Sequence, residues 1–338
     1  MLAIDVLPPV PVSDDAAAPA PRPRLVVGHA PDVHAGPGQV RIKVLAAGVN
    51  RADVLQAAGS YPPPAGASTV LGLEVSGVID EVGPGVSAFS TGEPVMALLD
   101  GGGYAEFAIA DARCVLPIPA GVDPVIAAGL PEALATANSN LHRAGIKAGD
   151  WVLIHGGSGG VGSHAIQIAA ALGAKVLATA GTAERVAKLL DLGATAVADY
   201  HDFDAEEALG NWVMAQTDGH GADIVLDVLG GARLDANIRT LAEGGRVVVI
   251  GSQAGNRATI NTTRLMRRRA SIIGTTLRSR SGEEKAAIIA DVARDVLPLL
   301  QDGRLRPVVG ATYPIAEAAQ AHADITSSKV FGKALLIL

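Results

Sequence analysis

The sequence has a single cysteine, Cys114, among its 338 residues. One thiol excludes an intrachain disulfide, which fits a chain that works in a reducing compartment. It also excludes zinc sites that use two or four cysteine ligands. The eight histidines include no pair spaced four residues apart, the spacing that lets two imidazoles share a metal on one helix face. We therefore expect no bound metal.

Basic charge and long apolar runs are also scarce. The formal net charge is -7, which argues against a nucleic-acid-binding surface, and the basic run Arg267–Arg269 is too short to change this. No positively charged segment followed by an apolar one opens the chain, and no apolar stretch is long enough to span a bilayer. We expect a cytoplasmic protein with no nucleic-acid or membrane partner.

Hydrophobic residues, at 49%, are plentiful enough for a sizeable core, and the length allows two domains. The most informative segment runs from Trp151 to Ala169, WVLIHGGSGGVGSHAIQIA. A strand-like apolar run meets Gly157, Gly159 and Gly162 in the pattern G-x-G-x-x-G, and a helical pattern follows. Glycines let backbone N–H groups approach a pyrophosphate, and a helix N-terminus favours the anion. We expect a dinucleotide site here.

The missing carboxylate after the next strand indicates which dinucleotide binds. Chains that bind NAD usually place Asp or Glu about 20 residues after the glycine loop, where it contacts the ribose 2′-hydroxyl. Here the strand KVLAT (Lys175–Thr179) leads into Ala180, Gly181 and Thr182 instead. The nearby Arg185 suits a 2′-phosphate, and Tyr200 offers a hydroxyl donor. Each of these two side chains also reads as an ordinary surface residue. We expect NADPH rather than NADH.

The two halves of the chain differ in pattern. About 150 residues before the glycine loop read as short strands separated by Gly and Pro, and the Pro- and Ala-rich run from Pro8 to Pro23 reads as an exposed loop. After about Pro124, strands and helices alternate, as in an α/β doubly wound parallel sheet. The expected strands are Gln39–Ala46, Glu74–Val82, Pro94–Leu98, Tyr104–Ile109, Trp151–Ile154, Lys175–Thr179, Thr195–Asp199, Ala222–Val228, Gly245–Gly251 and Lys333–Leu338. The expected helices are Ala133–Ala144, Val161–Ala169, Ala183–Leu192, Ala205–Thr217, Leu234–Leu241 and Glu283–Leu300.

Several motifs together resemble one known family. They are NRAD (Asn50–Asp53), GSYPPPAGAS (Gly59–Ser68), LGLEVSG (Leu71–Gly77), MALLDGGGYAEF (Met96–Phe107), LPEALAT (Leu130–Thr136), TLRSR (Thr276–Arg280) and GKALL (Gly332–Leu336). In this order they resemble the zinc-free, zeta-crystallin-like quinone oxidoreductases of the medium-chain dehydrogenase/reductase superfamily. The resemblance covers nearly the whole chain.

The resemblance implies a GroES-like, β-rich catalytic domain in two pieces, 1–125 and 271–338, around a Rossmann NADPH-binding domain, 126–270. It also implies a homodimer in which a strand within Ala270–Leu277 pairs with its twin. That run, ASIIGTTL, is apolar and β-branched, as an edge strand that seeks a partner would be, although a covering loop would explain it equally well. Zinc-dependent members of the superfamily have a cysteine ligand where this chain has Asn50, and a histidine where it has Leu73.

Without zinc, alcohol oxidation is disfavoured, and hydride transfer from NADPH to an electrophilic acceptor remains. The resemblance places Asn50 and Tyr61 in the cleft as catalytic residues, with Tyr104 a weaker candidate. Asn50 also reads as a helix cap and Tyr61 as a packing residue. The residues expected to bind the cofactor are Thr136, Gly159, Gly160, Val161, Gly162, Gly181, Thr182, Arg185, Tyr200, Gly251, Ser252, Leu277, Ser279 and Lys333.

The chain departs from relatives after the LPEALAT motif. Asn138, Ser139 and Asn140 stand where an aromatic residue is common, which predicts a wider or more polar pocket. The leading hypothesis is an NADPH-dependent quinone oxidoreductase. The alternatives are an NADPH-dependent enone or enoyl-thioester reductase, for which Arg278 and Arg280 offer a basic surface, and a non-catalytic NADPH-binding protein of the crystallin type.

Overall fold

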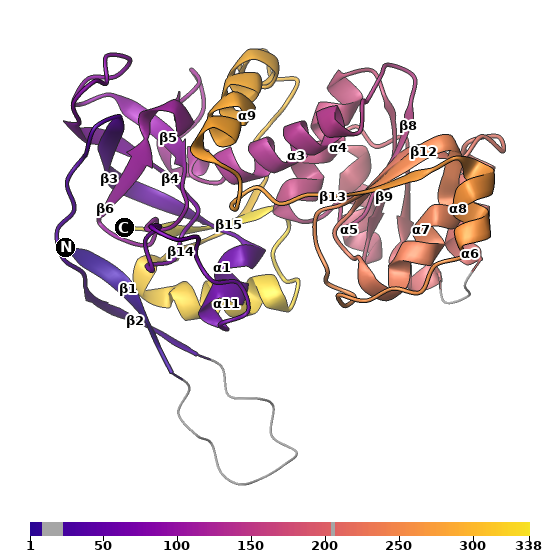
Figure 1. Ribbon diagram of the computed structural model, residues 1–338, viewed down its shortest axis with the longest axis horizontal. Coiled ribbons are helices and arrows are strands. Elements are labelled where there is room, and N and C mark those ends of the chain that lie inside the picture. Colours follow the sequence, from indigo (N-terminus) through magenta and orange to yellow (C-terminus); the bar gives the residue numbers. More distant parts are fainter. Residues whose placement is uncertain (9–22, 204–206) are drawn as a thin grey trace, which may run out of the picture. The chain divides into compact units, whose positions relative to one another are not determined.

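The computed structural model describes residues 1–8, 23–203 and 207–338 (Figure 1). Most of the expected Pro8–Pro23 loop therefore lies outside the described residues. The chain divides into two compact units. The first comprises Met1–Ala133, Arg278–Ala293 and Pro307–Leu338, and the second comprises Leu134–Leu277 and Arg294–Arg306. The domain boundaries expected from the sequence, at 125/126 and 270/271, stay a prediction.

The first unit is built on a seven-stranded sheet. Strand β3 (Gln39–Val49) lies near its middle, because β15, β4 and β6 all pair with it. Along β3 the residues Val40, Ile42 and Val44 are buried at every second position, as the two-residue period of a strand requires. The other strands are β1 (Leu2–Leu7), β2 (Arg24–His29), β4 (Glu74–Val82), β5 (Pro94–Leu98), β6 (Phe107–Asp111), β7 (Val115–Pro117), β14 (Val309–Pro314) and β15 (Lys333–Ile337), of which β1 and β2 form a separate hairpin.

Short helices accompany this sheet. They are α1 (Arg51–Ala57), η1 (Ala112–Cys114), α2 (Pro124–Ala127), η4 (Ile315–Glu317) and α11 (Ala318–Thr326), while α3 (Pro131–Arg143) and α9 (Gly282–Asp295) begin in this unit and continue past its limits. Two expectations need correction. The strand expected at Tyr104–Ile109 begins only at Phe107, after the turn that the three glycines make. The helix expected over Glu283–Leu300 is two helices, α9 and α10 (Leu297–Gln301), because Pro298 cannot continue the first and instead opens the second.

The second unit is a doubly wound parallel sheet, as the sequence predicts. Its six strands run in the order β10-β9-β8-β11-β12-β13, and every pair is parallel. The strands are β8 (Trp151–Ile154), β9 (Lys175–Ala180), β10 (Ala196–Asp199), β11 (Ala222–Asp227), β12 (Leu241–Val249) and β13 (Ser271–Gly274). The helices are α4 (Gly160–Ala171), α5 (Ala183–Leu190), η2 (Tyr200–Asp202), α6 (Ala208–Gln216), η3 (Gly231–Arg233), α7 (Leu234–Thr240) and α8 (Thr262–Arg268).

Successive residues of the central strands are buried whichever face they point to. Val152, Leu153 and Ile154 of β8 are all fully buried, so the sheet is covered on both faces. The strand order reverses between β8 and β11, and a ligand in such a fold binds at the carboxyl ends of the strands beside that point. Strand β13 stands at the edge of the sheet. The homodimer expected through this edge stays a prediction.

Candidate functional site

The glycine loop lies where the strand order reverses. Strand β8 ends at Ile154, and α4 begins at Gly160 with Gly159 as its N-cap residue. No side chain caps this helix, so no side chain competes for the N–H groups of its first turn. Such N–H groups and the helix dipole together form an anion site.

The glycines of this loop differ in what they tolerate. A Cβ on Gly162 would collide with the carbonyl oxygen of Gly156, and one on Gly157 would lie 2.8 Å from Leu189 Cδ1. The backbone itself therefore requires glycine at 162, whereas at 157 the end of the Leu189 side chain would have to shift. Gly159 differs: its φ of -85° is open to any residue, and a Cβ there would meet nothing closer than 3.4 Å. The space beside Gly159 is left open by the protein and fits a bound phosphate.

The end of β9 carries the groups expected at the ribose. Thr182 caps α5, and its Oγ1 accepts a hydrogen bond from Arg185 N at 3.3 Å. The guanidinium of Arg185 donates to Ser158 Oγ at 3.4 Å, which ties it to the glycine loop. The Tyr200 ring lies against Gly181, where a Cβ would stand 2.6 Å from the Tyr200 hydroxyl. Gly181, Thr182, Arg185 and Tyr200 are thus brought together, and Ser158, which was not predicted, joins them.

A buried histidine, His155, links the segments that carry the glycine loop. His155 follows β8 and shares hydrogen bonds with Thr179 Oγ1 (3.0 Å) and Asn237 Oδ1 (2.8 Å). Burial lowers the pKa of this histidine, so the ring is neutral. Asp227, at the end of β11, accepts hydrogen bonds from the backbone N–H groups of Leu229 and Gly230. These contacts fix the ends of β8, β9 and β11, which carry the loop.

The first unit contains a second polar network, centred on Asn50. Asn50 is the N-cap residue of α1, as one reading of the sequence has it, but its side chain makes other contacts. Its Oδ1 accepts from Lys333 Nζ at 2.7 Å, and its Nδ2 donates to Glu74 Oε1 at 3.0 Å. Lys333 Nζ also forms an ion pair of 2.5 Å with Glu74 Oε1 and donates to the carbonyl of Val49. Glu74 and Lys333 are both almost fully buried.

Asp53 continues this network into the core. One carboxylate oxygen accepts from Asn50 N (2.8 Å) and the other from Gly72 N (3.0 Å). The Tyr104 hydroxyl donates to Asp53 at 3.3 Å and lies 3.1 Å from His322 Nε2. Tyr104 is completely buried, so the sequence analysis was wrong to consider it for the cleft. Its apolar ring packs in the core and its hydroxyl is committed to the interior.

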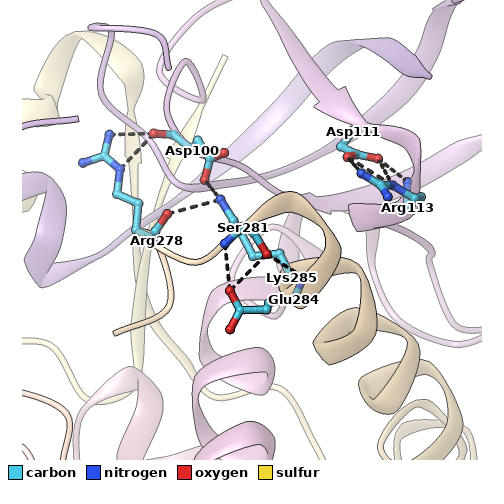
Figure 2. A network of polar contacts seen from close by, with 7 residues as sticks. All are labelled: Asp100, Asp111, Arg113, Arg278, Ser281, Glu284 and Lys285. Atoms are coloured by element: carbon cyan, nitrogen blue, oxygen red, sulfur yellow. Dashed lines mark hydrogen bonds and ion pairs between the residues drawn. The ribbon is translucent and has the colours of Figure 1, made fainter. Parts of the chain in front are cut away.

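Tyr61 is half-buried beside a fixed arginine. The Arg278 guanidinium lies over its ring, 5.7 Å from the centroid. That guanidinium donates to the carbonyl of Asp100 at 2.9 and 2.6 Å, while Lys285 pairs with the Asp100 carboxylate and donates to the carbonyl of Arg278 (Figure 2). Arg278 is only 4% exposed, which removes it from the basic surface proposed for an acyl carrier.

The remaining predicted residues divide between the units. Ser279 and Lys333 belong to the first unit, and Thr136, Gly251, Ser252 and Leu277 belong to the second. Gly251 lies against Gly230, because a Cβ added to Gly230 would stand 2.8 Å from the carbonyl oxygen of Gly251. The Thr136 carbonyl accepts from Asn140 Nδ2 at 2.7 Å. Asn138 and Asn140 are both buried, so neither forms an open polar surface. The cofactor contacts of these residues stay predictions.

In the part of the chain that the structure describes, no group of three or more His, Cys, Asp and Glu side chains is arranged to hold a metal ion. No helix in residues 1–8, 23–203 and 207–338 has the length and apolar character needed to cross a membrane.

Known proteins match both halves of this arrangement. Residues 36–120 match the alcohol dehydrogenase GroES-like domain, and residues 160–293 match the zinc-binding dehydrogenase family. A quinone oxidoreductase of Lama guanicoe is 38% identical over 303 residues, which are 89% of this chain and 89% of that protein. The chain belongs to the quinone oxidoreductase family of the medium-chain dehydrogenases/reductases.

Two further members of this comparison bear on the site. A mycobacterial structure solved in complex with NADPH is 31% identical, covers 93% of this chain and 96% of its own, and superposes with a TM-score of 0.83. A mycocerosic acid synthase-like polyketide synthase of Mycobacterium tuberculosis is 37% identical over 306 residues, 89% of this chain but 14% of that protein. Quinone oxidoreductases and a segment of a larger synthase therefore share this chain's sequence pattern.

Proposed function

We propose that this protein is an NADPH-dependent quinone oxidoreductase that works without a metal ion. The observation that carries the proposal is that the second unit has a dinucleotide-type glycine loop, while in the first unit the ammonium of Lys333 contacts Asn50 and Glu74. Asn50 and Leu73 stand at the two positions where zinc-dependent relatives have ligands. The buried ammonium of Lys333 supplies positive charge to Glu74 and Asn50 instead. Neither Asn50 nor Leu73 is a ligand that zinc prefers.

The preference for NADPH rests on the end of β9. In the position of the acidic residue that would bind a ribose 2′-hydroxyl, the chain has Gly181 and Thr182. Arg185 lies beside them, held to Ser158 of the glycine loop. A guanidinium pairs with phosphate through two parallel hydrogen bonds. The Arg185 guanidinium would attract a 2′-phosphate, whereas a carboxylate at Gly181 or Thr182 would repel it.

The bound dinucleotide supplies a hydride, and the protein supplies position and polarity. Asn50 Nδ2 has two hydrogens, of which one is donated to Glu74. The second is available to a substrate oxygen, and the contacts with Glu74 and Lys333 fix the orientation of the amide. Tyr61, held under Arg278, offers a ring face to a quinone. A quinone takes its protons from solvent, so this reaction needs no acid on the protein.

The open space at Gly159 gives a test of the cofactor site. We expect Gly159→Ala to fold as stably as the wild type, because its Cβ meets nothing closer than 3.4 Å. NADPH affinity should fall about tenfold or more, since the methyl group would occupy the space proposed for the pyrophosphate. Fluorescence titration with NADPH and thermal unfolding measure the two effects. Gly162→Ala is the matched control, because it should lower the melting temperature even without NADPH. Unchanged NADPH affinity in Gly159→Ala would place the pyrophosphate elsewhere.

The second candidate function is reduction of the C=C bond of an enone or enoyl thioester. The observation that favours it is a partly exposed carboxyl, Glu132, that has no partner within the described residues and suits proton transfer to carbon. A purely non-catalytic NADPH-binding role has less support, because it would not need the oriented amide of Asn50.

The two candidates are separated by a substrate panel. NADPH oxidation is followed at saturating cofactor with 1,4-benzoquinone and 9,10-phenanthrenequinone, and in parallel with simple α,β-unsaturated ketones. We expect turnover of the quinones. Turnover confined to enones would replace the proposed function by the second candidate. NADPH binding with no turnover of either class would leave the non-catalytic role.

A further inference from the structure

Three carboxyl groups interact electrostatically with one ammonium in the first unit. Asp53, Glu74 and Glu132 form this group, which we call the acid cluster, and Lys333, whose ammonium pairs with Glu74, is the cation. Three negative charges beside one positive charge, with Asp53 and Glu74 completely buried, are strongly unfavourable in a protein interior. The cluster therefore retains at least one proton, and the hydrogen bonds identify the carboxyl that carries it.

Two of the three carboxyls are bonded as ions. Glu74 accepts from Lys333 Nζ, Asn50 Nδ2 and the backbone N–H of Glu132, the last at 2.9 Å. Asp53 accepts from two backbone N–H groups and from the Tyr104 hydroxyl. Each of these donors stabilises the carboxylate form. Burial raises the pKa of Asp53 to about 6 even though its hydrogen bonds to the backbone N–H groups of Asn50 and Gly72 lower it.

Glu132 is different from both. It lies in the first turn of α3, and only its backbone N–H is bonded within the cluster. Its carboxyl oxygens have no hydrogen bond or ion pair anywhere in the described residues, and the side chain is partly exposed. The charges that face it are Glu74, Asp53, Lys333 and Arg278, with the Tyr61 phenol beside it. Burial, followed by the Glu74 charge, raises the pKa of Glu132 to about 8.

We propose that Glu132 is the proton donor of this site and that its substrates include α,β-unsaturated carbonyl compounds. The proposal rests on the proposed function, because it needs the same hydride source. The C=C bond accepts the hydride, with its two electrons, at the β-carbon. The O–H bond of Glu132 breaks, its proton forms the new C–H bond at the α-carbon, and its electron pair stays on the carboxylate. Solvent then returns a proton to Glu132.

The location of Glu132 supports this role. Its charge acts on Tyr61, because burial and then the Glu132 charge raise the pKa of that phenol. Tyr61 in turn lies under the anchored Arg278, so the groups on this side of the acid cluster are held in place. Asp53 and Glu74 are completely buried and cannot reach a ligand. Among the three residues of the acid cluster, Glu132 is the one that is partly exposed.

The kinetic test compares Glu132→Gln with the wild type on an enone and on a quinone. For the enone we expect kcat to fall on the order of 10²–10⁴-fold, the usual contribution of a general acid. Quinone reduction should fall far less than enone reduction, because a quinone takes its protons from solvent. The wild-type enone rate should fall as pH rises through about 8, because the acid form is lost, and the variant should lack this limb. Glu283→Gln is the control, since Glu283 has the same place in the first turn of α9 but is exposed.

A measurement without substrate completes the test. In protein labelled with δ-¹³C glutamate, one carboxyl resonance should titrate near pH 8 and be missing from Glu132→Gln. The proposal is overturned if Glu132 is ionised at pH 7, if the enone rate survives the substitution, or if the wild type reduces quinones but no enone. Absence of turnover with both substrate classes would instead defeat the proposed function, while the titration still reports on Glu132. If Glu132→Gln fails to fold, Glu132→Asp keeps the acid and provides the assignment.

Discussion

Replacing Lys333 by methionine should cost about 3–5 kcal/mol of folding stability, the usual penalty for leaving one partner of a buried ion pair uncompensated. Lys333 is only 3% exposed and its ammonium contacts Glu74, Asn50 and the Val49 carbonyl. Methionine fills most of the same volume but supplies no charge and no donor. Glu74 would then be fully buried without its cation, and the Asn50 amide would lose one of its two anchors. Urea denaturation at pH 7 measures the effect.

The matching double variant separates charge from packing. In Lys333→Met/Glu74→Gln no charge of the pair remains, so most of the lost stability should return. If the single and double variants are equally unstable, the ammonium acts through packing, and its role as a replacement for a metal charge fails. If Lys333→Met alone is harmless, the buried pair itself is not formed.

Arg185→Glu should reverse the preference between the two nicotinamide cofactors. The substitution puts a carboxylate where a 2′-phosphate is proposed to bind, beside Thr182 and Ser158. We expect NADPH affinity to fall on the order of 10²–10³-fold, the loss typical of a broken charge pair at a binding site. NADH, which has no 2′-phosphate, should lose little or bind more tightly because a carboxylate suits a 2′-hydroxyl. Dissociation constants for both cofactors measure this.

Lys188→Glu provides the control for net charge. Lys188 is on the same helix, exposed, and paired with Glu184 rather than directed to the end of β9. Both substitutions change the charge of the protein equally, so a general electrostatic effect would appear in both. Equal losses of NADPH and NADH affinity in Arg185→Glu would remove this residue from the 2′-phosphate site.

The Rossmann half was predictable because its signals are local. The glycine loop and the absence of an acid after β9 are each read within 30 residues, and the alternation of strands and helices predicts a doubly wound parallel sheet, although the strand order β10-β9-β8-β11-β12-β13 comes from the structure alone. The end of α9 was missed for a local reason too: the apolar pattern runs through Val296 to Leu300, while Pro298 stops the backbone from following it.

The acid cluster was not predictable in the same way. Asn50 and Tyr61 were found through motif resemblance, but their partners come from distant segments. Lys333 reaches Asn50 across 283 residues and Glu132 reaches Glu74 across 58. Glu74 stands among apolar residues in LGLEVSG, and a carboxylate in such a setting is the signal that was available. Only the folded structure shows that Lys333 pairs with Glu74 and that its charge acts on Asp53 and Glu132.

The measurement that tests the central claim most directly is NADPH oxidation with 1,4-benzoquinone after exhaustive dialysis against EDTA. The account predicts full activity, one NADPH consumed for each quinone reduced, metal content near zero, and much slower turnover with NADH. Loss of activity on dialysis with recovery on adding zinc would contradict it, because Asn50 and Lys333 would then not replace the metal.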